Sequence, residues 1–299
     1  MTWKVPRIET ALEIKIRTAP RLRSLIVTLW GDALLPYDGS VWMGCVPQLL
    51  MPLGFEEKAI RMAIQRLVSE GWLISEKDGR RRNLSMSDAH RPETQRVQAR
   101  VYTDAVPGWD GVWLLVRVEP ETAAERELVR RTLQQRGFGH FSPGLFIHPQ
   151  VAPNDLLQSP DMVCFTSSIT AVFQARELTN TAKLTEIWNI EALAAWWGDI
   201  ERLAIMAQNV ETPQDAFFSR VLLVHEVRRL VLAYPSLPLQ HLPEDWPEDR
   251  VRRVFRDVYW QLFSRSQRFL DEKLVLSGGT RPHWHGFDPH RFGREDHPG

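Results

Sequence analysis

The chain has 299 residues, enough for two or three domains, and its 37 Lys and Arg equal its 37 Asp and Glu in number. No apolar run is long enough to cross a bilayer, and the N-terminus lacks the pattern of a signal peptide. Two cysteines, Cys45 and Cys164, lie far apart without metal-binding spacing, so they fit small core residues of a reduced, cytoplasmic protein.

Two helices are predicted early in the chain. Residues 21–29 begin the first with a run of apolar side chains, and residues 55–70 form an amphipathic second helix that Gly71 ends. Its opposite face carries side chains that could reach base edges or phosphates; these are Lys58, Arg61, Gln65 and Arg66. The pattern alone also fits an ordinary surface helix with a solvated basic face.

A short basic hairpin follows, and it favours a DNA-binding helix over an ordinary surface helix. Residues 72–76 and 82–86 alternate apolar with polar, and Asp78-Gly79 is a strong signal for a two-residue turn. Positive charges gather at the tip and on the returning strand, where a wing would touch phosphates; these are Lys77, Arg80, Arg81 and Arg82. The order of helices and hairpin predicts a winged helix-turn-helix that binds duplex DNA.

The middle of the chain alternates strands with helices after a linking helix at residues 90–100. The expected elements are a strand at 111–118, a helix at 121–136, a strand at 145–148, a helix at 154–158 and a strand at 162–165. Two helices against one sheet suggest a ferredoxin-like α+β domain.

The last third is predicted to be helical. Asn189 is a plausible N-cap, Thr212-Pro213 begins another helix, and a third spans residues 251–262. The expected division is a 1–20 arm, a 21–105 winged helix with its linking helix, a 106–180 ferredoxin-like domain, a 181–275 helical domain and a 276–299 mobile tail.

Several motifs along the chain resemble the PaaX family of bacterial repressors. They are SLIVTLWGDA at residues 24–33, RLVSEGWL at 66–73, GRR at 79–81, GFG at 137–139 followed by PGL at 143–145, HEVRR at 225–229, and LPL at 237–239 followed by LPEDWP at 242–247. The resemblance implies an α+β multidomain protein with a winged helix, a Cas2-like central domain and a helical C-terminal domain. It also implies a homodimer that binds operator DNA and represses an aromatic-acid operon of the phenylacetate type. The implied inducer is phenylacetyl-coenzyme A or a related aryl-coenzyme A thioester, with no other cofactor.

A site for such a thioester needs Arg or Lys beside apolar walls, because coenzyme A carries several phosphate charges. Arg228, Arg229 and Trp197 are the first candidates, at the junction of the central and C-terminal domains. Further candidates of the same types are Arg252, Arg253, Trp196 and Trp260. All of them also fit a simpler interpretation, in which the Trp pack in the core and the Arg face solvent.

The sequence contains no evident catalytic site, so a regulator is expected rather than an enzyme. Cas2-like nucleases place an acidic residue at the end of the first strand, but Glu119 stands alone there and one carboxylate is a poor divalent site. The alternative is a nucleic-acid-processing enzyme or a coenzyme A thioester hydrolase with an added winged helix, which would need a nucleophile or carboxylate pair. No metal is expected, since four possible ligands fit no compact zinc motif; these are His225, Glu226, His241 and Asp245.

Overall fold

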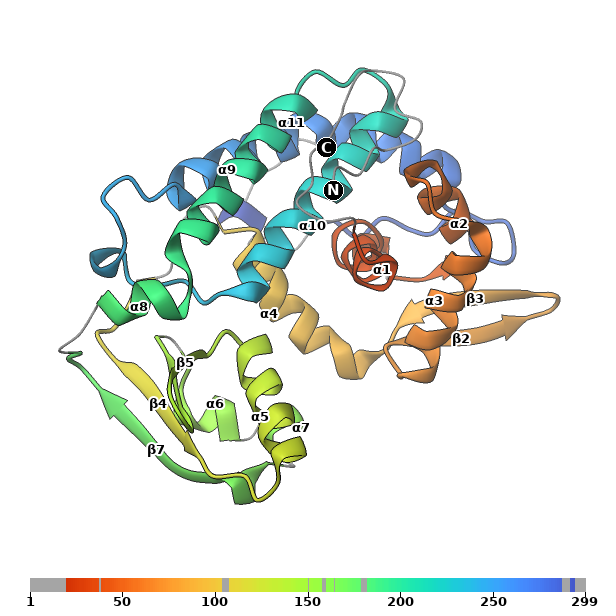
Figure 1. Ribbon diagram of the computed structural model, residues 1–299. Helices are drawn as coiled ribbons and strands as arrows, with labels where there is room; N and C mark the ends of the chain where they lie inside the picture. The colour runs from red at the N-terminus through yellow and green to blue at the C-terminus, as the bar shows by residue number, and fades with distance from the viewer. Residues whose placement is uncertain are drawn as a thin grey trace. The chain divides into compact units, whose positions relative to one another are not determined.

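The computed structural model describes residues 20–37, 39–103, 108–149, 151–157, 160–163, 165–178, 182–286 and 291–293. The chain forms two compact units (Figure 1). Unit 1 consists of Met1–Asp104, Gly198–Arg228 and Arg250–Gly299, and unit 2 of Ala105–Trp197 and Arg229–Asp249. These units follow contacts within the structure. The expected division into an arm, a winged helix, a central domain, a 181–275 helical domain and a tail stays a prediction.

Unit 1 begins with the helices that the apolar pattern predicts. Helix α1 (Leu22–Leu29) continues into a π-helical turn, Trp30–Leu34, and two further helices follow, α2 (Cys45–Leu50) and α3 (Glu57–Ser69). Gly71 follows the C-cap residue Glu70 of α3 with a φ of +73°, a left-handed conformation that glycine adopts without strain. The predicted helix at 55–70 is therefore confirmed.

The predicted hairpin is also confirmed. Strands β2 (Leu73–Asp78) and β3 (Arg81–Met86) pair antiparallel, and β1 (Val41–Trp42) adds to β3, giving the order β1-β3-β2. The turn residues are Gly79 and Arg80, one position later than the predicted Asp78-Gly79, because Asp78 pairs with Arg81. Gly79 takes a φ of +59° in this turn.

Long helices complete unit 1. The linking helix α4 (Arg91–Val101) follows the hairpin, and unit 1 also holds most of α10 (Pro213–Ala233) and α11 (Glu248–Lys273) and the end of α9 (Ile190–Ala207). The side chain of Asn189 accepts a hydrogen bond from the Ala192 amide, and that of Thr212 accepts one from the Asp215 amide, so both predicted helix starts are confirmed. Within the described residues, no helix is long and apolar enough to span a membrane.

The C-terminal stretch is packed where the structure describes it, although its composition predicts a mobile tail. Ser277 is buried, and the Trp284 ring lies 5.0 Å from that of Tyr37. Arg291 and Phe292 are also buried. Aromatic and charged partners far away in sequence hold these residues, which composition alone does not reveal.

Unit 2 is built on a four-stranded sheet in the order β5-β6-β4-β7, with every neighbouring pair antiparallel. Its strands are β4 (Trp113–Val118), β5 (Gly139–Ser142), β6 (Leu145–His148) and β7 (Ile169–Ala175). Its helices are α5 (Ala123–Gln135), α6 (Pro153–Leu157), α7 (Pro160–Val163) and α8 (Ala182–Ile187). Helices α5, α6 and α7 cover one face of the sheet, and their apolar side chains form its core (Figure 1).

Two predictions for this unit are wrong. The sequence pattern places the third strand at residues 162–165, but Met162 and Val163 end helix α7, and the last strand is β7 instead. A short apolar run fits a buried strand and a buried helix equally well. The pattern also omits β5, whose glycine start resembles a turn; Gly139 is needed there because a Cβ would stand 2.1 Å from Cγ2 of Ile187.

Candidate nucleic-acid interface and ligand pocket

Helix α3 presents a polar, basic face to solvent. Ile60, Ile64 and Leu67 are buried on its other face. The exposed side chains include all four that were predicted to meet DNA, namely Lys58, Arg61, Gln65 and Arg66. Glu57 and the apolar Met62 are exposed as well. Arg61 forms an ion pair with Glu57 at 2.5 Å, which holds its guanidinium near the start of the helix.

The hairpin carries an unfavourable arrangement of charges. Lys77 lies directly opposite Arg82 in the register of β2 and β3. Like charges in such cross-strand positions repel and destabilise a hairpin. Both residues are exposed, as is Arg80 at the tip, so an anionic partner outside the described chain would relieve the repulsion.

Arg81 differs from its basic neighbours, because the protein itself holds its side chain. Its guanidinium lies 4.6 Å from the centre of the Trp42 ring and donates a hydrogen bond to the Ser277 carbonyl at 2.9 Å. The prediction that Arg81 contacts DNA is not tested by this geometry, but the residue also has a structural role that the sequence did not reveal.

The same C-terminal segment also contacts the rest of the hairpin and strand β1. The Ser277 amide donates to Oδ1 of Asn83 at 2.9 Å, and the Ser277 hydroxyl donates to Asp78. The Trp42 amide donates to the Val275 carbonyl at 2.9 Å. These contacts fix the hairpin and β1 to the segment that follows α11, although 194 positions separate Asn83 from Ser277.

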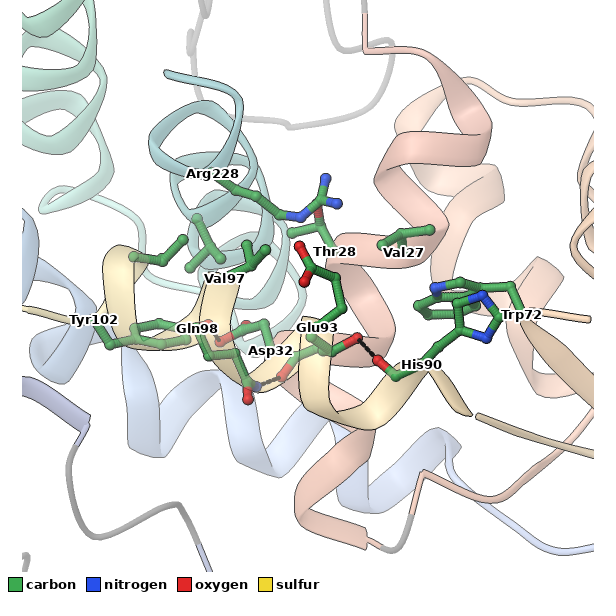
Figure 2. Close-up of a pocket in the computed structure, with 14 residues that line it drawn as sticks. Val27, Thr28, Asp32, Trp72, His90, Glu93, Val97, Gln98, Tyr102 and Arg228 are labelled. Atoms are coloured by element: carbon green, nitrogen blue, oxygen red, sulfur yellow. Dashed lines mark hydrogen bonds between the residues drawn. The ribbon is translucent and has the colours of Figure 1, made fainter. Parts of the chain in front are cut away.

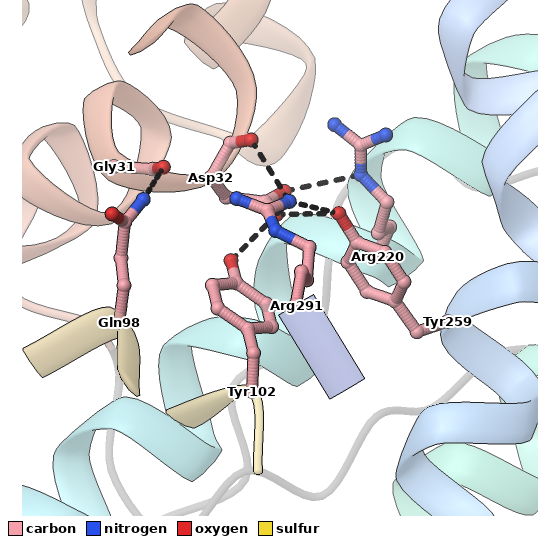
Figure 3. A network of polar contacts seen from close by, with 7 residues as sticks. All are labelled: Gly31, Asp32, Gln98, Tyr102, Arg220, Tyr259 and Arg291. Atoms are coloured by element: carbon pink, nitrogen blue, oxygen red, sulfur yellow. Dashed lines mark hydrogen bonds and ion pairs between the residues drawn. The ribbon is translucent and has the colours of Figure 1, made fainter. Parts of the chain in front are cut away.

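A buried polar network lies at the centre of unit 1 (Figure 3). The carboxylate of Asp32 accepts hydrogen bonds from the hydroxyls of Tyr102 at 2.7 Å and Tyr259 at 2.9 Å. It also forms ion pairs with Arg220 at 3.1 Å and Arg291 at 3.3 Å. Burial and the nearby carboxylate raise the pKa of both tyrosines, so their hydroxyls stay protonated as donors. One carboxylate thus faces two guanidinium groups. In the sequence, only the position of Asp32 within an apolar helical run points to this network.

The C-terminal end of α4 is held firmly. Tyr102, just after the helix, belongs to the buried network. Arg252, a candidate for coenzyme A binding by sequence, is buried and donates to the carbonyls of Arg100 at 3.0 Å and Thr103 at 3.4 Å. An Arg that satisfies the last carbonyls of a helix stabilises its end, so Arg252 has a structural role here.

A pocket opens beside α4 in unit 1 (Figure 2). Its empty volume is about 520 Å³, open solvent included, and most of its wall is apolar. The lining residues come from α1, α4, α10 and the chain near them; they are Val27, Thr28, Gly31, Asp32, Trp72, His90, Glu93, Thr94, Val97, Gln98, Val101, Tyr102, Val224 and Arg228.

Arg228 is the one predicted effector residue that lines this pocket. Its half-buried guanidinium donates to the Ser24 hydroxyl at 3.3 Å. Burial, with the nearby charge of Arg23, lowers the Arg228 pKa to about 10. Within the described part of the chain, no carboxylate forms an ion pair with it.

The other two predicted effector residues belong to unit 2. Arg229 lies with its guanidinium 5.3 Å from the ring centre of Trp196, and Trp197 is fully buried. The pocket beside α4 brings neither of them to Arg228. The sequence does not reveal the pocket itself, since its walls come from four separated stretches, which are residues 27–32, Trp72, residues 90–102 and residues 224–228.

The residues considered for metal binding or catalysis have other partners. His225 is buried with Nδ1 2.9 Å from the Thr28 hydroxyl, and His241 packs on Trp109. Glu119 forms an ion pair with Arg117 at 3.1 Å. Among the described residues, no group of three His, Cys, Asp or Glu could hold a metal ion.

Comparison with known proteins places these features in a family. Residues 21–90 match the domain described as PaaX-like protein, residues 106–184 the PaaX protein central Cas2-like domain, and residues 187–272 the PaaX-like protein C-terminal domain. The chain is 30% identical over 291 residues to the transcriptional repressor PaaX of Escherichia coli (strain K12), covering 92% of each chain. It is similar in fold to the uncharacterized protein Rv0674 from Mycobacterium tuberculosis, with a TM-score of 0.51 and 22% identity over 83% of this chain and 97% of that one. The chain therefore belongs to the PaaX family.

Proposed function

We propose that this protein is a transcriptional repressor that binds operator DNA through α3 and the hairpin. The observation that carries the proposal is the opposed, exposed pair of Lys77 and Arg82, which an anionic backbone would stabilise. The Escherichia coli relative bears the name of a transcriptional repressor, which supports the same role.

The N-terminal part of unit 1 acts as a winged helix in this proposal. Arg61 and Gln65, on the exposed face of α3, read base edges in the major groove. Lys77, Arg80 and Arg82 contact phosphates or the minor groove and set the position of the domain. The central domain is ferredoxin-like, an assignment that the strand order β5-β6-β4-β7 supports.

The protein acts as a homodimer on a pseudo-palindromic site, since one winged helix covers only one half-site. Its target is an operon for aromatic-acid catabolism of the phenylacetate type, and the effector is an aryl-coenzyme A thioester such as phenylacetyl-coenzyme A. It works in the cytoplasm as a regulator rather than as an enzyme. Light scattering at concentrations that give operator binding tests the dimer, and a monomer bound specifically to its operator would contradict it.

Fluorescence anisotropy tests the DNA-binding surface. A labelled duplex from the region upstream of the gene should bind more weakly as salt rises, and each phosphate that the protein neutralises contributes about 0.9 to the steepness of the logarithmic slope. The double variant Lys77→Ala, Arg82→Ala should bind every duplex more weakly with a flatter slope. The matched control Arg131→Gln, an exposed arginine of unit 2, should bind like the wild type. Equal affinity and slope for the double variant and the wild type would reject this surface.

A further inference from the structure

The pocket beside α4 combines apolar walls with Arg228, a cation that forms no ion pair with any carboxylate among the residues that the structure describes. Val27, Val97, Val101 and Val224 supply aliphatic wall, and the indole of Trp72 adds an aromatic surface. Apolar pockets with a few polar groups that fix orientation are the usual form of small-molecule sites.

Arg228 supplies the polar group at one end of the pocket. Figure 2 shows its side chain extending from α10 towards Thr28. The hydroxyl of Ser24, which accepts its hydrogen bond at 3.3 Å, is neutral and cannot balance the charge. A partly buried cation without a carboxylate is costly, and an anionic or acceptor oxygen from a ligand would remove that cost.

The acidic residues that line the pocket do not neutralise the charge of Arg228. The carboxylate of Asp32 is already bound by two arginines and two tyrosine hydroxyls. The side chain of Glu93 is 67% exposed and lies 3.4 Å from Arg96, so water and another cation surround it. Arg23, the second cation near Arg228, forms an ion pair with Glu70.

We infer that this pocket binds an arylacyl group, with the aryl ring between the valines and Trp72 and the acyl oxygen on Arg228. The inference rests on the proposed function, because it names the place where the aromatic effector of the repressor binds. A free aryl carboxylate and the acyl end of an aryl thioester share this chemistry. Arg228 is the one Lys or Arg among the residues that line the pocket, and here it binds the acyl oxygen. Those phosphates would stay outside the pocket.

The position of the pocket also connects an effector to the DNA-binding surface. Its wall includes Trp72, which directly precedes β2, and helix α4, which closely follows the hairpin. The middle of α4 packs closely on the turn after α1, with Nε2 of Gln98 2.5 Å from the Gly31 carbonyl. A ring inserted between these helices would press on the segment that carries the wing.

Calorimetric titration of the full-length protein tests the inference, with phenylacetate and phenylacetyl-coenzyme A as separate probes. At least one should bind, and Arg228→Gln should weaken that binding tenfold or more. Val97→Phe should fill the pocket and abolish it. The control Arg131→Gln changes an exposed arginine of unit 2 and should bind like the wild type.

The possible results distinguish a failure of the ligand-site inference from a failure of the proposed repressor function. Failure of the wild type to bind either probe would overturn the inference, as would unchanged binding by both Arg228→Gln and Val97→Phe. Anisotropy with operator DNA is measured on the same preparations, and retained DNA binding shows that a loss of ligand binding is not a loss of fold. A wild type that binds a probe through Arg228 but binds no DNA would reject the repressor while keeping the pocket.

Discussion

Replacing Asp32 by Asn removes the one carboxylate that the described part of the chain places in the buried network of unit 1. Arg220 is fully buried and Arg291 is 5% exposed, and each forms its ion pair with this one carboxylate. Removing one partner of a buried ion pair costs about 3–5 kcal/mol, because the remaining charge is left uncompensated away from water. We therefore expect Asp32→Asn to lower the free energy of unfolding by at least that amount.

Arg220→Met is the matched variant, and it should behave differently. It removes one of two cations and leaves a balanced pair between Asp32 and Arg291, and replacing buried charge by apolar volume is often close to neutral. Its cost should stay below about 2 kcal/mol. Urea unfolding at pH 7, followed by fluorescence of the 12 Trp, measures both variants. Equal losses for the two variants, or a loss below about 1 kcal/mol for Asp32→Asn, would refute the reasoning.

Three further predictions concern individual side chains. Ser277→Ala should speed amide exchange in β2 and β3, since it removes the hydroxyl that donates a hydrogen bond to Asp78. Unchanged exchange would show that this hydrogen bond does not hold the hairpin. Gly139→Ala should destabilise the protein by about 1–3 kcal/mol, as overpacking does, because a Cβ would stand 2.1 Å from Ile187; an unchanged melting temperature would contradict this. Hydrogen bonds from Arg130 and Arg131 lower the Glu127 pKa to about 2 from 4.5, so this group stabilises the fold above pH 4.5 and stops doing so as pH falls towards 2. The difference in melting temperature between wild type and Glu127→Gln should therefore shrink from pH 5 to pH 2. A constant difference would show that the ionised Glu127 carboxylate does not stabilise the fold.

The sequence predicts the parts of this fold whose signals are local. The helical period of Ile60, Ile64 and Leu67 identifies α3, and Asp78-Gly79 identifies the hairpin tip, because each pattern is set within a few residues. The basic face of α3 follows directly from that period.

Features that depend on distant partners could not be predicted. The tail composition gives no sign that Arg291 reaches Asp32 across 259 positions. Arg81 resembles its neighbours in sequence, and only the structure shows Trp42 and Ser277 around it. The prediction of a strand at 162–165 is wrong for another reason. Helix α7 has only four residues, which is too few for a periodic pattern to distinguish a helix from a strand.

If the pocket holds the effector, its occupancy and DNA binding must affect each other equally. A ligand releases DNA only by binding more tightly to the conformation that does not bind DNA, and this linkage is reciprocal. Helix α4 offers a physical route, because Tyr102 and Arg252 fix its C-terminal end while residues 87–90 connect its N-terminal end to strand β3 of the hairpin. A ligand that occupies the pocket should therefore displace the N-terminal end of α4, which is connected to the hairpin.

Titration with phenylacetyl-coenzyme A in the presence and absence of operator duplex measures this coupling. Saturating operator should weaken effector binding by the same factor by which saturating effector weakens operator binding, and a tenfold effect corresponds to about 1.4 kcal/mol. Arg228→Gln should weaken effector binding while leaving operator affinity near that of the wild type when effector is absent. Equal effector affinity with and without operator would show that the two sites are not coupled, and α4 would then have no part in induction.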